Sequence, residues 1–80
     1  MKHARKDYDR FQDPENKIPE DEPVMLFRAQ DKHFTRVLGF YYALLRESDN
    51  LEVAHAVQDH IKLALQWQAK NKKKVKEPDL

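Results

Sequence analysis

Apolar residues recur at helical spacing along two stretches in the second half of the chain. In residues 32–47 they follow the i, i+3, i+4, i+7 spacing of an amphipathic helix, at Phe34, Val37, Leu38, Tyr41, Leu44 and Leu45. In residues 51–70 they form two adjoining rows, one of Leu51, Ala54, Val57, Ile61, Ala64 and Leu65 and one of Val53, Ala56, Leu63 and Trp67. Neither proline nor glycine interrupts the second stretch, and its Ala, Leu, Gln and Lys content favours helix. Both stretches are therefore predicted to be helices.

The residues before and between these helices carry signals for helix starts. Asp31 precedes the first helix, where its carboxylate can accept a hydrogen bond from the free N–H group of residue 33 or 34. Ser48, Asp49 and Asn50 make a compact turn, in which Asp49 or Asn50 can cap the second helix. Such a short link between two amphipathic helices predicts an antiparallel hairpin.

The apolar run Val24-Met25-Leu26-Phe27, which follows Pro23, fits either a short helix or a short buried strand, because periodicity alone does not separate the two. Proline is well suited to the first helical position. A lone strand would have no obvious partner in this chain, so the short helix is favoured.

The ends of the chain are polar and differ in charge. Residues 1–22 contain five Lys/Arg and seven Asp/Glu, with Pro14 and Pro19, whereas residues 70–80 contain five Lys and two acids. The whole chain has a net charge of only +1. The predicted fold is all-α: a polar flexible arm (1–22), a helical domain (23–70) in which a short helix precedes an antiparallel helical hairpin, and a basic tail (71–80).

Each predicted helix carries more apolar surface than one neighbour can cover. Phe40 and Leu44 lie to one side of the first stripe, and Val53, Leu63 and Trp67 form a second row on the other helix. Because contiguous apolar patches mark interfaces, we expect these residues to meet another protein, most simply a second copy that completes a four-helix bundle as a dimer. The alternative is a monomeric three-helix protein.

Gly39 is the single glycine of the chain and falls within the first predicted helix. With Thr35 and Ala43 it makes a row of small residues that would let another backbone approach closely, so it joins the predicted protein interface. The alternative is a glycine tolerated on the surface.

A second candidate site is basic. Arg28, Lys32 and Arg36 are four residues apart and would form a row on a continuous helix, although Asp31 as a cap would bend that row. Together with Lys72, Lys73 and Lys74 of the tail, they predict an alternative function as a binder of nucleic acid or a nucleotide-like anion. The competing interpretation is a solvated face and a solubilising tail.

Other chemistry has little support in the sequence. His55 and Asp59 share one helical face, but His60 points about 100° away and no local third ligand completes a metal site. The chain has no glycine-rich phosphate loop, no serine nucleophile elbow and no cysteine. Its apolar runs are far shorter than the ~20 residues of a membrane span, and no signal peptide is apparent. We therefore expect a cytoplasmic, non-enzymatic protein without a metal or cofactor.

The block "PEDEPVMLFRAQDK", followed by an amphipathic helix and the segment "LALQWQAK", resembles short bacterial and phage proteins that share a "DEPVF-LRAQD" start and have no established function. The resemblance covers roughly residues 18–70; Met25 and the order Leu26-Phe27 depart from the block. It implies a bacterial or phage cytoplasmic protein and supplies no site residues. We therefore predict a small self-associating interaction module, such as a phage accessory factor that acts on a host protein.

Overall fold

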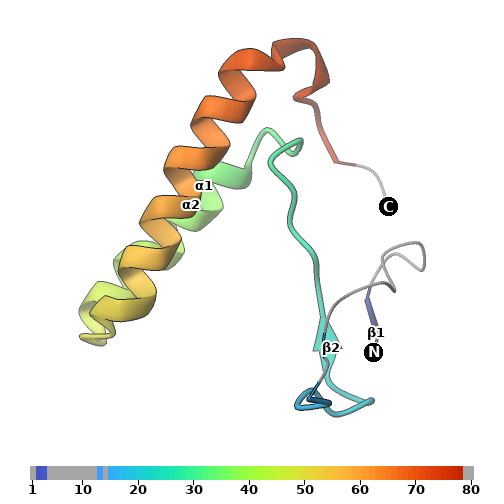
Figure 1. Ribbon diagram of the computed structural model, residues 1–80, viewed down its shortest axis with the longest axis vertical. Helices are drawn as coiled ribbons and strands as arrows, with labels where there is room; N and C mark the ends of the chain where they lie inside the picture. Colours follow the sequence, from blue (N-terminus) through green and yellow to red (C-terminus); the bar gives the residue numbers. More distant parts are fainter. Residues whose placement is uncertain (1, 4–12, 14, 79–80) are drawn as a thin grey trace.

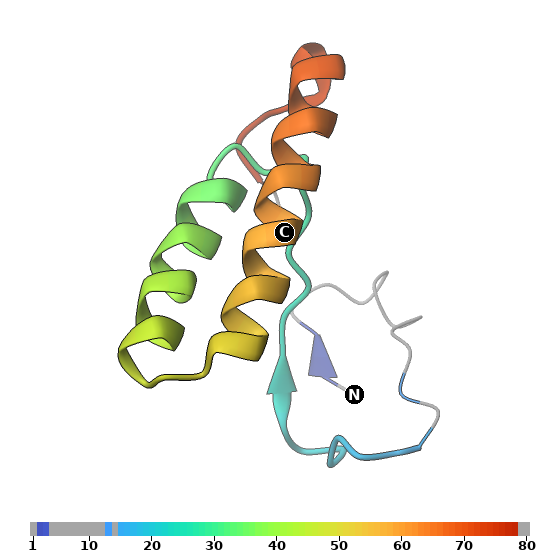
Figure 2. The same cartoon turned by 60° about the vertical axis from the view of Figure 1, so that its left-hand side comes forward.

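Two antiparallel helices dominate the fold (Figure 1). The computed structural model describes residues 2–3, 13 and 15–78. Helix α1 spans Phe34–Glu47 and helix α2 spans Leu51–Lys70. The helices lie side by side and are joined at one end by a short turn, as Figure 2 shows. The prediction of a mostly helical protein built on a helical hairpin is confirmed.

The turn between the helices closes α1 and starts α2 with backbone and side-chain hydrogen bonds. Asp49 adopts a left-handed conformation with φ of 60°. The N–H of Asn50 donates to the carbonyl oxygen of Leu45 at 2.9 Å, and the N–H of Asp49 donates to that of Arg46 at 3.1 Å. This pattern satisfies the last carbonyl groups of α1. The side chain of Asn50 accepts from the N–H of Val53 at 3.5 Å, so Asn50 is the N-cap of α2, as predicted.

The contact between the helices is narrow and uses small residues. Its buried side chains are Phe34 and Leu45 from α1 and Ala54 and Ala64 from α2. Ala54 has no exposed surface at all. Half-buried side chains flank them: Leu38, Tyr42, Val57 and Ile61. The short side chains of Ala54 and Ala64 fill little of this contact, and several larger apolar residues of both helices stay outside it and are exposed.

Helix α1 begins two residues later than the sequence predicted. The side chain of Asp31 accepts a hydrogen bond from the N–H of His33 at 2.7 Å, and its carbonyl oxygen accepts from the N–H of Phe34 at 3.0 Å. His33 is the N-cap residue and makes no side-chain capping bond. Asp31 therefore accepts a hydrogen bond from the N–H of residue 33, as predicted, but it does so from a turn that precedes the helix.

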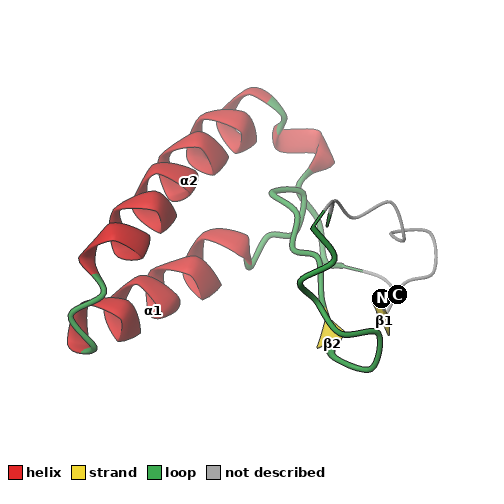
Figure 3. Ribbon diagram, turned by 60° about the horizontal axis from the view of Figure 1, so that its bottom comes forward, coloured by secondary structure: helices red, strands yellow, loops and turns green. Residues whose placement is uncertain are grey.

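The predicted short helix before the hairpin is wrong. Pro23–Val24 is strand β2, which pairs in parallel with strand β1 at Lys2–His3, so that Lys2 lies opposite Pro23 and His3 opposite Val24 (Figure 3). The helix was favoured because no partner strand was apparent, yet the start of the chain supplies one across the long connection that parallel pairing requires. Residues 4–12 and 14 of the predicted arm lie outside the described residues.

The segment after β2 reaches the hairpin through an aromatic contact. The ring of Phe27 lies 6.3 Å from the ring of Phe34, at an interplanar angle of 49°. This tilted arrangement is favourable for two aromatic rings. Phe27 thus contacts the start of α1, although it stays as exposed as Leu26, at 40%, and Met25 is more exposed still.

The chain after α2 folds back onto the start of the hairpin. A short 3-10 helix, η2, spans Lys72–Lys74. Beyond it the N–H of Lys76 donates to the carbonyl oxygen of Gln30, and the N–H of Lys32 donates to that of Lys76, both at 3.0 Å. Gln68 adds a side-chain bond to the carbonyl oxygen of Ala29 at 2.9 Å. The described part of the tail is therefore attached to the hairpin.

Gly39 offers a direct test of the first helix. A methyl group added at Gly39 meets no atom within 4 Å. Glycine inside a helix costs about 1 kcal/mol relative to alanine, so Gly39→Ala should raise the free energy of unfolding by about that amount in urea denaturation followed by circular dichroism.

Ala43→Gly, at an exposed position one turn further along α1, should lower the free energy of unfolding by a similar amount and is the matched control. A less stable Gly39→Ala protein, or one with a changed molecular mass, would show that the glycine is needed for a close contact with another chain.

Candidate functional site

The exposed side of α1 carries a complete apolar stripe. Val37, Phe40, Tyr41 and Leu44 are all exposed, and Phe40 is the most exposed of them at 70%. Their i, i+3, i+4, i+7 spacing places them on one side of the helix. With about 100° per residue, this stripe is centred roughly 100° from the buried strip that faces α2.

Helix α2 carries a matching stripe. Val53, Leu63 and Trp67 are exposed, and Ala56 and His60 lie between them at helical spacing. This stripe is centred about 100° from the buried strip of α2. His60 is its one polar member.

Both stripes lie on the same side of the hairpin. Viewed along each helix from its own N-terminus, both stripes are displaced from the buried strip in the same rotational sense. Because the helices are antiparallel and their buried strips face each other, equal rotations bring the two stripes to one side. They form a continuous surface, which we call the apolar face: Val37, Phe40, Tyr41, Leu44, Val53, Ala56, His60, Leu63 and Trp67.

The structure brings five of the six predicted interface residues together on this face: Phe40, Leu44, Val53, Leu63 and Trp67. The sixth, Gly39, lies about 150° from the centre of the α1 stripe, on the other side of the hairpin. Val37 and Tyr41 were assigned to the main apolar stripe of the sequence, although they are exposed. The signal that could have separated them is the shift of roughly 100° between two overlapping stripes on one helix.

Arg28, Lys32 and Arg36 do not form a line along one helix, as the expected cap at Asp31 suggested. Arg28 lies in a turn closed by a hydrogen bond of 3.0 Å from the N–H of Asp31 to the carbonyl oxygen of Arg28, whereas Arg36 is in the first turn of α1. Between them, Lys32 Nζ lies 2.7 Å from Glu77 Oε1. This ion pair makes Lys32 a partner of the returning tail, and an external anion would compete with Glu77 for it.

Glu77 also reaches His33, whose Nε2 lies 3.1 Å from Oε2. The hydrogen bonds from Lys32 and from His33, in that order, hold the pKa of the Glu77 carboxyl below its ordinary value. We call the hydrogen-bonded pairing of residues 30–33 with residues 76–77 the clasp. It joins the start of α1 to the chain that follows α2.

The clasp has a predicted pH dependence. Because the pKa of folded Glu77 is lowered, its ion pair stabilises the folded state fully at pH values above the ordinary carboxyl range. That contribution is lost as the pH falls through the lowered value. An NMR titration of the Glu77 side chain should give a pKa lower than that of an unperturbed glutamate, and Lys32→Gln should raise it.

Lys62→Gln is the control, because Lys62 lies in the middle of α2, far along the chain from the clasp. An unchanged Glu77 titration in Lys32→Gln would show that the ion pair does not persist in solution. The exposed positions of both side chains make salt an additional check, since added salt screens such pairs.

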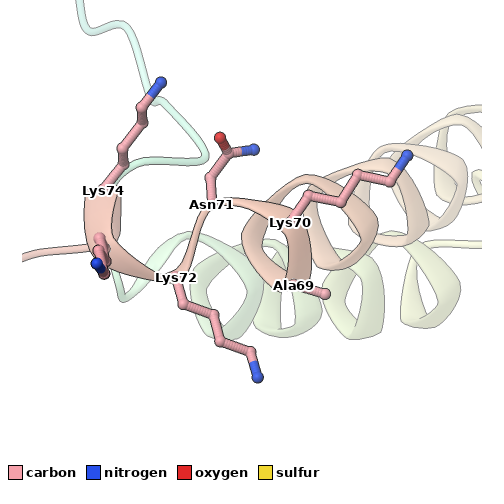
Figure 4. A pocket seen from close by; sticks show the side chains of 6 residues that line it. Ala69, Lys70, Asn71, Lys72 and Lys74 are labelled. Atoms are coloured by element: carbon pink, nitrogen blue, oxygen red, sulfur yellow. The ribbon is translucent and has the colours of Figure 1, made fainter.

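A group of lysines surrounds the turn between α2 and the clasp. Figure 4 shows a shallow, open hollow lined by Ala69, Lys70, Asn71, Lys72, Lys73 and Lys74. The labelled Lys70, Lys72 and Lys74 side chains point in different directions (Figure 4). Asn71 shapes the turn, because its side-chain amide donates to the carbonyl oxygen of Trp67 at 2.8 Å. Among the described residues, no acidic group pairs with these lysines, which we call the lysine turn.

His55 and Asp59 share one face of α2 but gain no third ligand from the rest of the described chain. His55, Asp59 and His60 are exposed on α2, and no set of three ligating side chains gathers anywhere in the described ranges. None of the helices described combines the length and apolar character needed to cross a membrane.

Comparison with known proteins gives no relative from which a function could be transferred. No family model matches the chain, and no curated protein or solved structure shows significant similarity to it. The functional argument therefore depends on the apolar face and the lysine turn.

Proposed function

We propose that this protein is a small, non-enzymatic interaction module that associates with itself through the apolar face. The observation that carries this proposal is the alignment of seven large exposed apolar side chains on one side of the hairpin. Contiguous patches of this kind are rare on monomeric soluble proteins and are typical of interaction sites.

The composition of the face supports a protein partner. Phe40, Tyr41 and Trp67 are aromatic, and aromatic residues are enriched in the buried centres of protein interfaces. The face also lacks Lys, Arg, Asp and Glu, which are depleted at such centres. Two hairpins that pack by their apolar faces would form a four-helix bundle, which is a common way to bury a second stripe on each helix.

Two leucines of α2 form a matched pair for testing this proposal. Leu63 is 59% exposed and belongs to the apolar face, whereas Leu65 is 53% exposed and lies on the other side of the hairpin. Leu63→Gln should weaken self-association at least tenfold, because it places an amide in the buried centre of the interface. Leu65→Gln should leave the association unchanged.

Sedimentation equilibrium over micromolar concentrations measures both variants against the unaltered protein. An unaltered protein with the mass of one chain throughout this range would overturn self-association. Equal weakening by Leu63→Gln and Leu65→Gln would show association through a different surface.

The similarity to bacterial and phage proteins, and action on a host protein, remain predictions.

A second candidate function is binding of nucleic acid or another polyanion by the lysine turn. The observation that favours it is the concentration of Lys70, Lys72, Lys73 and Lys74 around one turn without acidic partners among the described residues. Such a site would attract phosphates electrostatically and without sequence preference. Arg28, Lys32 and Arg36 contribute less than the sequence suggested, because they do not form one helical row and Lys32 is paired with Glu77.

Salt dependence tests this second candidate. A fluorescent single-stranded oligonucleotide should bind at low salt and lose most of its affinity between about 50 and 200 mM salt. Replacing Lys72, Lys73 and Lys74 with Gln should reduce the steepness of that dependence by about two, since each neutralised phosphate contributes roughly 0.7 to the slope. Lys62→Gln is the single-site control. Binding that the triple replacement does not weaken would argue against the lysine turn as the site.

A further inference from the structure

Charged residues beside the apolar face are sorted by the two ends of the hairpin. We call the end that holds residues 48–50 the turn end and the opposite end the open end. Along the outer edge of α1, Arg36 lies near the open end and Glu47 at the turn end. Along the outer edge of α2, Glu52 lies at the turn end and Lys70 at the open end. All four side chains are exposed.

Neighbouring residues strengthen the same division. The lysine turn adds three lysines to the open end through Lys72–Lys74, and Asp49 adds an acid to the turn end. Two residues run against the division: Glu77 at the open end is already paired with Lys32 and His33, and Arg46 at the turn end lies on the other side of the hairpin. The open end is therefore basic and the turn end acidic along the edges of the apolar face. A second molecule that packs on this face meets these charges at the rim of the contact. The apolar centre does not determine the orientation of that molecule, so the rim charges can.

Two symmetric arrangements can bring two apolar faces together, and the rim charges distinguish them. If the two-fold axis runs parallel to the helices, open ends meet open ends. Arg36 then lies over the edge of the second copy's α2 near Lys70, and Glu47 lies near Glu52, so like charges face each other. This arrangement is disfavoured.

If the two-fold axis crosses the helices at right angles within the contact plane, each open end meets a turn end. Helix α1 packs on the second copy's α1 and α2 on the second copy's α2, both antiparallel. Arg36 then faces Glu47 of the second copy, and Glu52 faces Lys70 of the second copy. Symmetry repeats both pairs, as it does in every two-fold contact between identical chains.

From this charge pattern, and resting on the proposed self-association, we propose that the protein forms an antiparallel face-to-face dimer. The open end of each hairpin lies on the turn end of the other. The apolar face supplies the affinity, and the pairs Arg36–Glu47 and Glu52–Lys70 between copies determine the orientation. The long Arg and Lys side chains suit this role, because charged residues at comparable rim positions determine helix orientation in coiled coils.

The residues nearest the axis on α2 are Asp59 and His60. Asp59 is on the outer edge, and His60 is the polar member of the apolar face. In the antiparallel arrangement Asp59 lies near His60 of the second copy, and His60 lies near Asp59 of the second copy. The two Asp59 carboxylates also approach one another. The centre of α2 therefore contributes little to orientation, which depends on the charges at the two ends.

Two complementary charge-reversal variants test the orientation. One carries Glu47→Lys and Glu52→Lys, and the other carries Arg36→Glu and Lys70→Glu. Each variant alone should self-associate about tenfold more weakly than the unaltered protein, because all rim pairs become repulsive. Mixed in equal amounts they should form a heterodimer with near-original affinity, since every rim pair is again opposite in charge. Added salt should weaken this preference.

Arg46→Glu combined with Lys62→Glu is the matched control, because it changes net charge as much as the second variant but on the other side of the hairpin. It should dimerise like the unaltered protein. Circular dichroism confirms that each variant retains its helices. Native mass spectrometry of the mixture, with one variant isotopically labelled, counts homodimers and heterodimers.

The outcomes separate the orientation from the proposed function. Weak homodimers with a strong heterodimer support the antiparallel dimer. Two variants that dimerise as well as the unaltered protein, or a mixture without preference for the heterodimer, overturn this orientation and leave self-association through the apolar face intact. An unaltered protein that stays monomeric overturns self-association and the orientation together.

Discussion

The narrow contact between α1 and α2 is the constraint on which the rest of the structure depends. Two helices share only one strip of contact, and here small residues, Ala54 and Ala64, occupy the α2 side of that strip. The contact buries Phe34 and Leu45 of α1 against these alanines, and it leaves most of the other large apolar side chains of the hairpin partly or fully exposed. The large apolar residues next to the strip must therefore find another environment, and the antiparallel arrangement gathers most of them on one side.

The clasp adds contacts to the hairpin beyond this narrow strip, between residues 30–33 and residues 76–77. A hairpin with so small a core gains from any contact that restricts its loose end. The backbone N–H of Lys32 donates to the carbonyl oxygen of Lys76, and the side chain of Gln68 donates to the carbonyl oxygen of Ala29. These bonds join the segment before α1 to α2 and to the segment that follows it. The same segment after α2 also carries the lysine turn and holds it at the open end. The contacts that stabilise this end and the lysines that make it basic therefore belong to one segment of the chain.

The sequence predicted the parts of the fold that depend on local signals. Helical periodicity located α1 and α2, and the Asn50 cap followed from turn chemistry. Features that depend on distant partners were missed. Strand β2 needed a strand from the start of the chain, and the clasp needed backbone hydrogen bonds between segments far apart in the sequence, such as the bond between Lys32 and Lys76. The apolar face was predicted in outline, but its division from the core required knowing which strip of each helix faces the other.

The charges on α1 make most sense when a second chain is considered. A helix dipole favours acids near the N-terminus and bases near the C-terminus, yet Arg36 lies in the first turn of α1 and Glu47 in the last. On α2, Glu52 and Lys70 follow the dipole preference. Local helix stability thus explains Glu52 and Lys70 on α2 and Arg46 in the last turn of α1, but it opposes Arg36 and Glu47. The proposed antiparallel dimer would place Arg36 beside Glu47 of the other copy, and would so give each of these two residues an oppositely charged neighbour, which neither has among the described residues of the single hairpin.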